Sequence, residues 1–263
     1  MDLSIIIINY KTPEILNLCV KSLKSTIAKI RYEIIVVDVE SDYKTEYFIR
    51  DSFPDVIFVP LEKNAGYSKS VNAGIKKIES GGKYLLALNA DIIVKPEAID
   101  KMFSYMENNP KTGISGPQLL NFNNTFQNSY FRFYTPKIIL YRRTVLKDFS
   151  FAKKALEYFL MKGGDHRLTQ PVDWLMGSAL FIRRSALEKV GPMDERFFMY
   201  FEDVDWCRRF WDNGFGVIYY PEAKMAHYHG KQSSESKKYA IVHIISAIKY
   251  FWKYLGKPLP KIN

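Results

Sequence analysis

The segment LSIIIINY, residues 3–10, decides the fold, because an unbroken run of apolar, β-branched side chains is typical of a strand buried on both faces. Thr12 and Pro13 follow it, and this pair indicates a helix N-cap with proline in the first turn. We expect that helix to extend to about Ala28 and Tyr32–Asp38 to form a second buried strand. Residues 3–38 therefore predict a strand–helix–strand unit with parallel strands.

The same alternation continues through the first half of the chain. It predicts strands at Val56–Pro60 and Tyr84–Leu88 and helices at Tyr43–Ser52, Gly66–Ile78 and Pro96–Asn108. This order favours an α/β fold, with a mainly parallel central sheet covered by helices on both faces. Ligands bind such sheets beyond the carboxyl ends of the strands. The polar groups at those ends are Asn9-Tyr10, Asp38, Asn64 and Asn89-Ala90-Asp91.

The second half is less regular, and we expect it to belong to the same single domain. The predicted elements are strands within residues 113–135, a basic and mainly helical segment over 137–162, a strand pair around Gly177, a helix over Glu202–Asn213, short strands at Gly216–Tyr220 and Ala223–Tyr228, and a helix over Tyr239–Leu255. We divide the chain into a nucleotide-binding half (1–112), an acceptor and catalytic half (113–230) and a C-terminal amphipathic helical appendage (231–263).

The cysteine content and the charge of the chain indicate the compartment in which it works and the partners that suit it. The 263 residues contain two cysteines, Cys19 and Cys207, and no apolar run of about 18 residues. This predicts buried thiols in a reducing compartment and a cytoplasmic protein. The net charge of +10 is concentrated in residues 130–162, which carry +6, and 223–263, which carry +7. Basic segments suit a nucleic acid or an anionic membrane, and charge alone does not decide between them.

Two of the strand-end groups are candidates for nucleotide binding. Asp38 could accept a hydrogen bond from the N–H edge of a base, or it could cap the next helix. Asp91, with Asn89 nearby, fits a carboxylate that shares a divalent cation with substrate phosphates, although a simple turn explains the same residues. The chain lacks the GxGxxG and GxxxxGK[ST] motifs, which argues against dehydrogenases and P-loop enzymes.

The acidic segment Glu202-Asp203-Val204-Asp205 begins a predicted helix, where carboxylates commonly just stabilise the helix dipole. Asp203 shares a helical face with Trp206 and Phe210, so we expect it to point into the protein or a cleft. Asp205 lies about 200° away around the helix. A carboxylate placed like Asp203 can act as general base toward an acceptor hydroxyl.

Two histidines, His227 and His229, alternate along one predicted strand, so both side chains point to the same side of it. Neutral imidazole is a good ligand for Mn²⁺-like ions. The alternative is one packed and one surface histidine. We favour His227 as the functional residue.

Taken in order, these segments resemble family 2 glycosyltransferases, above all their rhamnosyltransferase-like branch. The similarity covers about residues 3–230, and its order and spacing are more specific than any one motif. The matching segments are Ile5-Ile6-Ile7-Ile8-Asn9-Tyr10, Glu33-Ile34-Ile35-Val36-Val37-Asp38, Asn64-Ala65-Gly66 with Asn72, Leu88-Asn89-Ala90-Asp91, Trp174-Leu175-Met176-Gly177-Ser178-Ala179 with Arg183-Arg184, Gly191-Pro192-Met193-Asp194-Glu195, Phe197-Phe198-Met199-Tyr200, and Glu202-Asp203-Val204-Asp205-Trp206-Cys207-Arg208-Arg209.

The resemblance implies a GT-A (Rossmann-like) fold and an inverting transfer of a sugar, with rhamnose a candidate. The donor would be a dTDP-, UDP- or GDP-sugar, and the acceptor a hydroxyl of a glycan or lipid-linked saccharide. Further implied are Mg²⁺ or Mn²⁺ held by Asp91 and His227, and Asp203 as catalytic base. The implied acceptor-binding residues are Trp174, Gly177 and Glu202. The implied donor-binding residues are Asn9, Tyr10, Asp38, Asn64, Gly66, Asn72, Asn89 and Asp91.

The predicted C-terminal helix has an apolar stripe flanked by basic residues. The stripe is Ile241, Ile244, Ile245, Ile248 and Trp252, and the flanking residues are Lys237, Lys238, Lys249 and Lys253. Such a helix packs on its own domain or lies at a membrane interface. Because residues 130–162 have the same character, we hypothesise peripheral contact with the inner leaflet of the cell membrane.

Two rival functions stay open at this point. A nucleic-acid-binding module is disfavoured because no recognisable motif accompanies the basic segments. A catalytically inactive relative is disfavoured because Asp91, Asp203 and His227 are all present.

Overall fold

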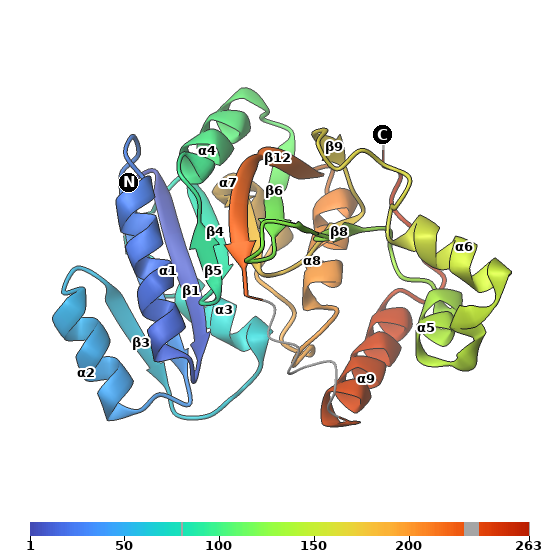
Figure 1. The fold of residues 1–263 in the computed structure, drawn as a ribbon, viewed down its shortest axis with the longest axis horizontal. Coiled ribbons are helices and arrows are strands. Elements are labelled where there is room, and N and C mark those ends of the chain that lie inside the picture. Colours follow the sequence, from blue (N-terminus) through green and yellow to red (C-terminus); the bar gives the residue numbers. More distant parts are fainter. Residues whose placement is uncertain (80, 229–236, 263) are drawn as a thin grey trace.

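The computed structural model describes residues 1–79, 81–228 and 237–262, which form a central sheet between two layers of helices (Figure 1). The main sheet has the order β3-β2-β1-β4-β11-β6-β12-β5, with β7 beside β6 and β9 beside β12. Its strands are β1 Leu3–Tyr10, β2 Tyr32–Val39, β3 Ile57–Leu61, β4 Tyr84–Asn89, β5 Ile92–Val94, β6 Thr112–Leu120, β7 Phe126–Gln127, β9 Gln170–Pro171, β11 Ala179–Arg183 and β12 Gly216–His227. A second small sheet pairs β8 Tyr130–Phe131 with β10 Trp174–Leu175.

The helices connect and cover these strands. They are α1 Pro13–Thr26, α2 Tyr43–Ser52, α3 Tyr67–Ile75, α4 Ala98–Asn108, α5 Pro136–Arg143, α6 Ser150–Phe159, α7 Arg184–Val190, α8 Glu202–Asp212 and α9 Lys237–Lys253, with a 3₁₀ turn at Val145–Asp148. Strand β1 pairs in parallel with β2 and β4, as does β2 with β3 and β6 with β12. The predicted α/β fold with a mainly parallel sheet is confirmed.

Both faces of the sheet are buried, which explains the continuous apolar runs in its strands. Ile5 and Ile7 of β1 belong to the core beneath α1, α2 and α4, whereas Ile6 belongs to the core beneath α3, α7 and α8. Cys19 and Cys207 are both buried free thiols, as the sequence predicts. Within the described ranges, no helix is long and apolar enough to span a bilayer.

The in-register pairing of the parallel strands brings the polar strand ends together. Asn9 lies opposite Asp38 across β1 and β2, and Ile8 lies opposite Asn89 across β1 and β4. The carboxyl ends of β1, β2 and β4 therefore present their polar residues at one edge of the sheet, where the sequence predicts a ligand site.

Two predictions for the second half are wrong in detail. The strands on either side of Gly177 do not pair with each other, because β10 pairs with β8 and β11 pairs with β4 and β6. Residues Gly216–Tyr220 and Ala223–Tyr228 are not two strands but one, β12, with a shift of register between Tyr220 and Lys224. Pro221 lies in that irregularity, where a residue without an N–H disturbs the ladder least. The short helix α7 was not predicted.

The C-terminal helix α9 buries the face opposite to the apolar stripe. Ala247, Tyr250 and Tyr254 enter the core that also holds Trp206 and Phe210 of α8. The predicted apolar stripe points outward instead, and all of its members are exposed: Ile241, Ile244, Ile245, Ile248 and Trp252. The side chains of Lys237 and Lys238, His229, and the proposed 230/231 boundary lie outside the described residues.

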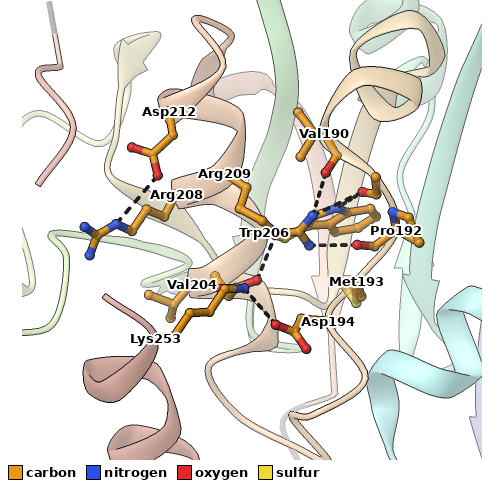
Figure 2. Close-up of polar contacts among 12 residues, drawn as sticks. Val190, Pro192, Met193, Asp194, Val204, Trp206, Arg208, Arg209, Asp212 and Lys253 are labelled. Carbon is orange, nitrogen blue, oxygen red and sulfur yellow. Dashed lines mark hydrogen bonds and ion pairs between the residues drawn. The ribbon is translucent and has the colours of Figure 1, made fainter. Parts of the chain in front are cut away.

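Buried charges fasten α9 to α8. Asp205 of α8 is fully buried and accepts hydrogen bonds from Arg209 Nε (2.9 Å), the Tyr254 hydroxyl (2.8 Å) and Lys253 Nζ (2.5 Å). Lys253 Nζ also lies 2.7 Å from the carboxylate of Asp194, a residue of the loop before α8 (Figure 2). Lys253 therefore does not flank a solvent-exposed stripe as predicted, but ties α8, α9 and this loop together.

Replacing Lys253 by methionine keeps the apolar stem but leaves Asp205 short of one cationic partner. We expect Lys253→Met to lower the free energy of unfolding by about 3 kcal/mol, as breaking a buried ion pair does. Urea denaturation measures the loss. Lys249→Met is the control, because Lys249 bonds only the Arg196 carbonyl at an exposed site, and its loss should cost less than about 1 kcal/mol. Equal stability of the two variants would contradict the role assigned to Lys253.

Candidate functional site

A cavity of about 280 Å³ opens at the carboxyl edge of the sheet. Its wall gathers residues from β4, β12, α3, α8 and the segment between β10 and β11, which are distant in sequence. The lining residues are Tyr67, Asn89, Asp91, Met176, Gly177, Ser178, Met199, Tyr200, Glu202, Asp203 and His227. Six predicted site residues thus meet in one place: Asn89, Asp91, Gly177, Glu202, Asp203 and His227.

A second cavity of about 460 Å³ adjoins the first, and the two share Tyr67, Asn89 and Asp91. The second cavity is also lined by Tyr10, Thr12 and Tyr228. One cavity therefore extends from the shared residues toward β1, and the other extends from them toward α8. The two cavities together suit a ligand that has one part in each cavity, with Asp91 between the two parts.

Asp91 and His227 come together although 136 positions of chain separate them, because β12 pairs with β5 directly after Asp91. His227 Nε2 lies 3.4 Å from Asp91 Oδ1, and His227 Nδ1 lies 3.1 Å from Gln127 Oε1. Gln127 Oε1 can accept a hydrogen bond from His227 Nδ1, which orients the imidazole and leaves Nε2 directed at Asp91, as in many metal-ligating histidines.

The oxygen atoms beside this pair fit a divalent cation. Asn89 Oδ1 and Asp91 Oδ1 are buried, and neither has a hydrogen-bond partner among the described residues. Buried polar atoms normally find a partner, so unmatched oxygens next to an imidazole indicate a missing electropositive ligand. The described residues contain no cluster of three or more His, Cys, Asp or Glu side chains. The set therefore fits an ion that takes its remaining ligands from substrate phosphates and water, as Mg²⁺ and Mn²⁺ do.

Asp203 faces the cavity from the first turn of α8 and is held by backbone groups. The Gly177 N–H donates to Asp203 Oδ2 at 3.0 Å, and the Val204 N–H donates to Asp203 Oδ1 at 2.8 Å. The Gly177 carbonyl in turn accepts a hydrogen bond from the Tyr67 hydroxyl at 2.6 Å. Gly177 therefore links α3 to α8, and its lack of a side chain keeps the approach to the carboxylate open.

The two neighbouring carboxylates of α8 have different proton affinities. Burial raises the pKa of Asp203 to about 6, while hydrogen bonds from the Gly177 and Val204 N–H groups limit the rise. Burial, and then the charge of Asp203, raises the pKa of Glu202 well above its usual value. Glu202 Oε2 is buried without a hydrogen-bond partner in the described structure. Asp203 is therefore ionised at neutral pH, and Glu202 holds its proton more tightly than a free carboxyl group does.

The backbone before α8 is strained. Tyr200 and Phe201 both adopt left-handed conformations, with φ of 67° and 68°, which cost bulky residues about 1 kcal/mol or more each. Packing enforces this conformation, because the Phe201 ring lies among Tyr134, His243 and Tyr250. The strained pair turns the chain so that Tyr200, Glu202 and Asp203 all reach the cavity wall.

A glycine at the start of α3 allows the loop before α8 to approach closely. Gly66 has φ of 95°, and a Cβ added to it would lie 2.3 Å from the Phe198 carbonyl oxygen. The Tyr67 N–H donates to that same oxygen at 2.8 Å, and Asn64 Oδ1 accepts from the Gly66 N–H at 3.0 Å. Asn64 and Gly66 therefore shape the loop that positions Tyr67.

Asn9 and Asp38 form a buried pair one strand away from the shared cavity wall. Asn9 Nδ2 donates to Asp38 Oδ1 at 2.7 Å, and the Thr12 hydroxyl donates to Asn9 Oδ1 at 2.8 Å. Burial raises the pKa of Asp38, although hydrogen bonds from Ser41 and Asn9 oppose the rise. Asn9 thus orients Asp38, while Tyr10 is largely exposed and lines the second cavity.

Two predicted site residues serve packing instead. Asn72 is buried and bonds the Met193 carbonyl (2.9 Å), the Met193 N–H (3.0 Å) and Glu195 (3.0 Å), beside a separate, mostly apolar cavity of about 430 Å³. Trp174 is buried, stacks on Phe131 with ring centroids 4.4 Å apart, and donates to the Arg132 carbonyl. Both side chains were expected to contact a ligand, but their polar groups bond other parts of the protein.

Sequence reasoning missed several residues of the cavity wall. Met199 and Tyr200 belong to an aromatic run that reads as core, and Ser178 and Gln127 carry no pattern that would single them out. Tyr67 was not missed in this way, because its position after a glycine at a strand–helix junction marks it as a residue that could shape the donor pocket. Its burial and the nearby carboxylates of Glu202, Asp203 and Asp91 raise its pKa well above the usual value, so its hydroxyl stays protonated as a donor.

Comparison with known proteins shows which family the chain belongs to. The chain is 31% identical over 210 residues to the low-salt glycan biosynthesis hexosyltransferase Agl10 of Haloferax volcanii, a match that covers 79% of this chain and 61% of Agl10. It is 29% identical over 194 residues to the N-acetylglucosaminyl-diphospho-decaprenol L-rhamnosyltransferase of Mycobacterium tuberculosis, covering 67% of this chain and 60% of that protein. The chain spans about three fifths of the length of these relatives.

Among solved structures, the crystal structure of GalNAc-T7 with UDP, GalNAc and Mn²⁺ superposes with a TM-score of 0.66 at 17% identity, covering 94% of this chain and 48% of that one. At this identity the likeness concerns the fold, which is GT-A as predicted. The model of the family described as "Glycosyl transferase family 2" matches residues 4–191. Because this match covers most of its length, the chain belongs to glycosyl transferase family 2.

Proposed function

We propose that this protein is an inverting, metal-dependent glycosyltransferase that moves a sugar from a nucleoside diphosphate to an acceptor hydroxyl. The observation that supports it most is the wall of the cavity of about 280 Å³, which carries both the proposed metal ligands and the proposed base. On one side Asp91, Asn89 and His227 present oxygen and nitrogen ligands suited to a cation bound by diphosphate, and on the other side Asp203 presents an ionised carboxylate. A donor that straddles Asp91 has its sugar in the cavity bordered by Asp203.

In the proposed reaction, Asp203 accepts the proton of the acceptor hydroxyl as the acceptor oxygen bonds to the anomeric carbon. The bond from that carbon to the diphosphate breaks at the same time, and its electron pair leaves with the phosphate oxygen. Because attack and departure occur on opposite faces, the configuration inverts. A Mg²⁺ or Mn²⁺ ion held by Asp91 and His227 would supply positive charge to the leaving diphosphate. Glu202 lines the same cavity and is placed to form a hydrogen bond with the acceptor.

The relatives suggest which molecules react. The name of the M. tuberculosis relative specifies L-rhamnose and a lipid diphosphate acceptor, and that of the H. volcanii relative specifies a hexosyl group and a glycan pathway. We therefore propose a dTDP-, UDP- or GDP-sugar as donor, with rhamnose the first sugar to test, and a lipid-linked saccharide as acceptor. Such an acceptor places the enzyme in the cytoplasm, peripherally on the inner face of the cell membrane.

The reaction should depend on the ionisation of Asp203. Its pKa of about 6 lies above the usual carboxyl value, so the base is protonated and inactive below pH 6 and ionised above it. We expect kcat/KM to fall about tenfold per pH unit below pH 6 and to level off near pH 7. Initial rates between pH 4.5 and 8 measure this profile. A flat profile down to pH 5 would contradict Asp203 as base.

Calorimetric titration of the purified protein with dTDP, UDP and GDP, each with and without Mn²⁺, tests the proposed function. We expect one nucleotide to bind, with an affinity that rises when Mn²⁺ is present. Failure of all three to bind would refute the donor assignment and favour the nucleic-acid-binding alternative. Binding followed by no sugar transfer to any lipid-linked acceptor would favour a catalytically inactive relative.

A further inference from the structure

The outer face of α9 is an apolar surface without a covering element among the described residues. Trp252 is 78% exposed and Ile248 is 62% exposed, while the buried side of the same helix contacts α8. The stripe continues past the helix through Leu255 and Leu259, which are also exposed. From Ile241 to Trp252 it extends about 17 Å along the helix axis. Contiguous apolar patches of this kind usually mark a binding surface.

Basic side chains surround this stripe. Arg142 and Arg143 are exposed at the end of α5, which lies beside α9 at one end of the molecule (Figure 1). The Arg142 guanidinium donates to the Tyr134 hydroxyl at 2.6 Å, and the Tyr134 ring contacts His243 of α9. These contacts hold Arg142 close to the part of α9 that contains His243. Lys249 and Lys257 are exposed near its other end.

We propose that the outer face of α9 is the surface by which the protein binds an anionic membrane. An apolar stripe with Ile, Leu and an exposed Trp, bordered by Lys and Arg, suits burial at the boundary between headgroups and acyl chains. A second copy of the chain fits this face less well, because the exposed basic residues Arg142, Arg143, Lys249 and Lys257 would then face basic residues of the other copy. Anionic lipid is complementary to them.

The inner face of α9 relates this surface to the cavity. The Ser246 hydroxyl donates to the Met199 carbonyl at 2.8 Å, and the ring of His243 lies 5.3 Å from that of Tyr200. Met199 and Tyr200 both line the cavity that contains Asp203. A bilayer against the outer face of α9 would therefore lie one helix thickness from the proposed acceptor site. This arrangement rests on the proposed function and extends it, because it explains how a lipid-linked acceptor reaches Asp203.

Vesicle flotation tests the surface without requiring activity. We expect the protein to float with phosphatidylcholine vesicles that contain phosphatidylglycerol, to float less at high salt, and to stay behind with phosphatidylcholine alone. The double variant Ile245→Glu/Ile248→Glu should reduce partitioning at least about tenfold. The matched control is Leu18→Glu/Tyr47→Glu, which places the same charges at exposed apolar sites of α1 and α2 and should float like the unmodified protein.

Tryptophan fluorescence provides a second measurement. Trp174 and Trp206 are buried and Trp211 is partly buried, whereas Trp252 is largely exposed, so we expect anionic vesicles to cause a blue shift that comes mainly from Trp252 and vanishes in Trp252→Phe. Nucleotide titration of each variant confirms that the fold is intact and separates this proposal from the proposed function. Equal flotation of stripe and control variants, or no flotation of the unmodified protein, would overturn the proposal. So would a dimer in solution that the stripe variant dissociates.

Discussion

The variant Asp203→Asn should lower kcat by about a thousandfold, or roughly 4 kcal/mol in activation free energy. Asparagine has nearly the same shape, and its carbonyl oxygen can still accept the Gly177 N–H that Asp203 accepts at 3.0 Å. It cannot accept the acceptor's proton. The substitution therefore removes the proposed base while it preserves the wall of the cavity.

Three measurements separate a catalytic loss from a structural one. Calorimetry should give the same nucleotide affinity for Asp203→Asn as for the unmodified protein, and the inflection near pH 6 should disappear from its residual activity. Asp212→Asn, on the last turn of the same helix, is the matched control and should retain full activity. A loss of less than about tenfold for Asp203→Asn would mean that another group removes the proton.

The variant Asp91→Ala should abolish the effect of Mn²⁺ on nucleotide binding. Removing a carboxylate ligand leaves His227 and Asn89, too few protein donors to hold a divalent ion in competition with water. We expect nucleotide affinity in Mn²⁺ to fall about a hundredfold and kcat/KM about a thousandfold. Calorimetry and initial rates measure the two effects.

Metal removal gives an internal control for this prediction. A chelator should weaken nucleotide binding by the unmodified protein about as much as the substitution does, and should have no further effect on Asp91→Ala. Asp51→Ala, an exposed carboxylate on α2, should respond to Mn²⁺ and chelator like the unmodified protein. If Asp91→Ala keeps its response to Mn²⁺, the ion binds elsewhere.

The first half of the fold could be predicted from sequence because its strands are buried on both faces. Such strands are continuous apolar runs, and their ends are marked by residues such as Asn9, Asp38 and Asn89. The second half could not be predicted as well, since β10 and β11 border Gly177 yet pair with different sheets. Short strands whose partners are far away in sequence leave no periodic signal.

The meeting of Asp91, Asp203 and His227 at one cavity was predictable, because each of them lies at the end of a strand or helix. The role of a side chain was not predictable where an element distant in sequence determines whether that side chain is buried. Asp205 looks like an ordinary first-turn acid, yet α9 covers it and supplies Lys253 and Tyr254 as partners. The sequence of α9 also could not show which of its faces is buried. Both faces carry large apolar side chains, with Tyr250 and Tyr254 on one and Ile248 and Trp252 on the other.

The position of β12 has a consequence for how the protein is made. This strand is the last one of the sheet to leave the ribosome, yet it is inserted between β6 and β5, and its final residue is His227. A nascent chain that stops before it has unpaired edges on both strands, which expose it to association with other chains. Completion of the sheet and assembly of the proposed ion site are thus the same late event. A growing chain has no means of holding the ion at Asp91 and His227 before its sheet is closed.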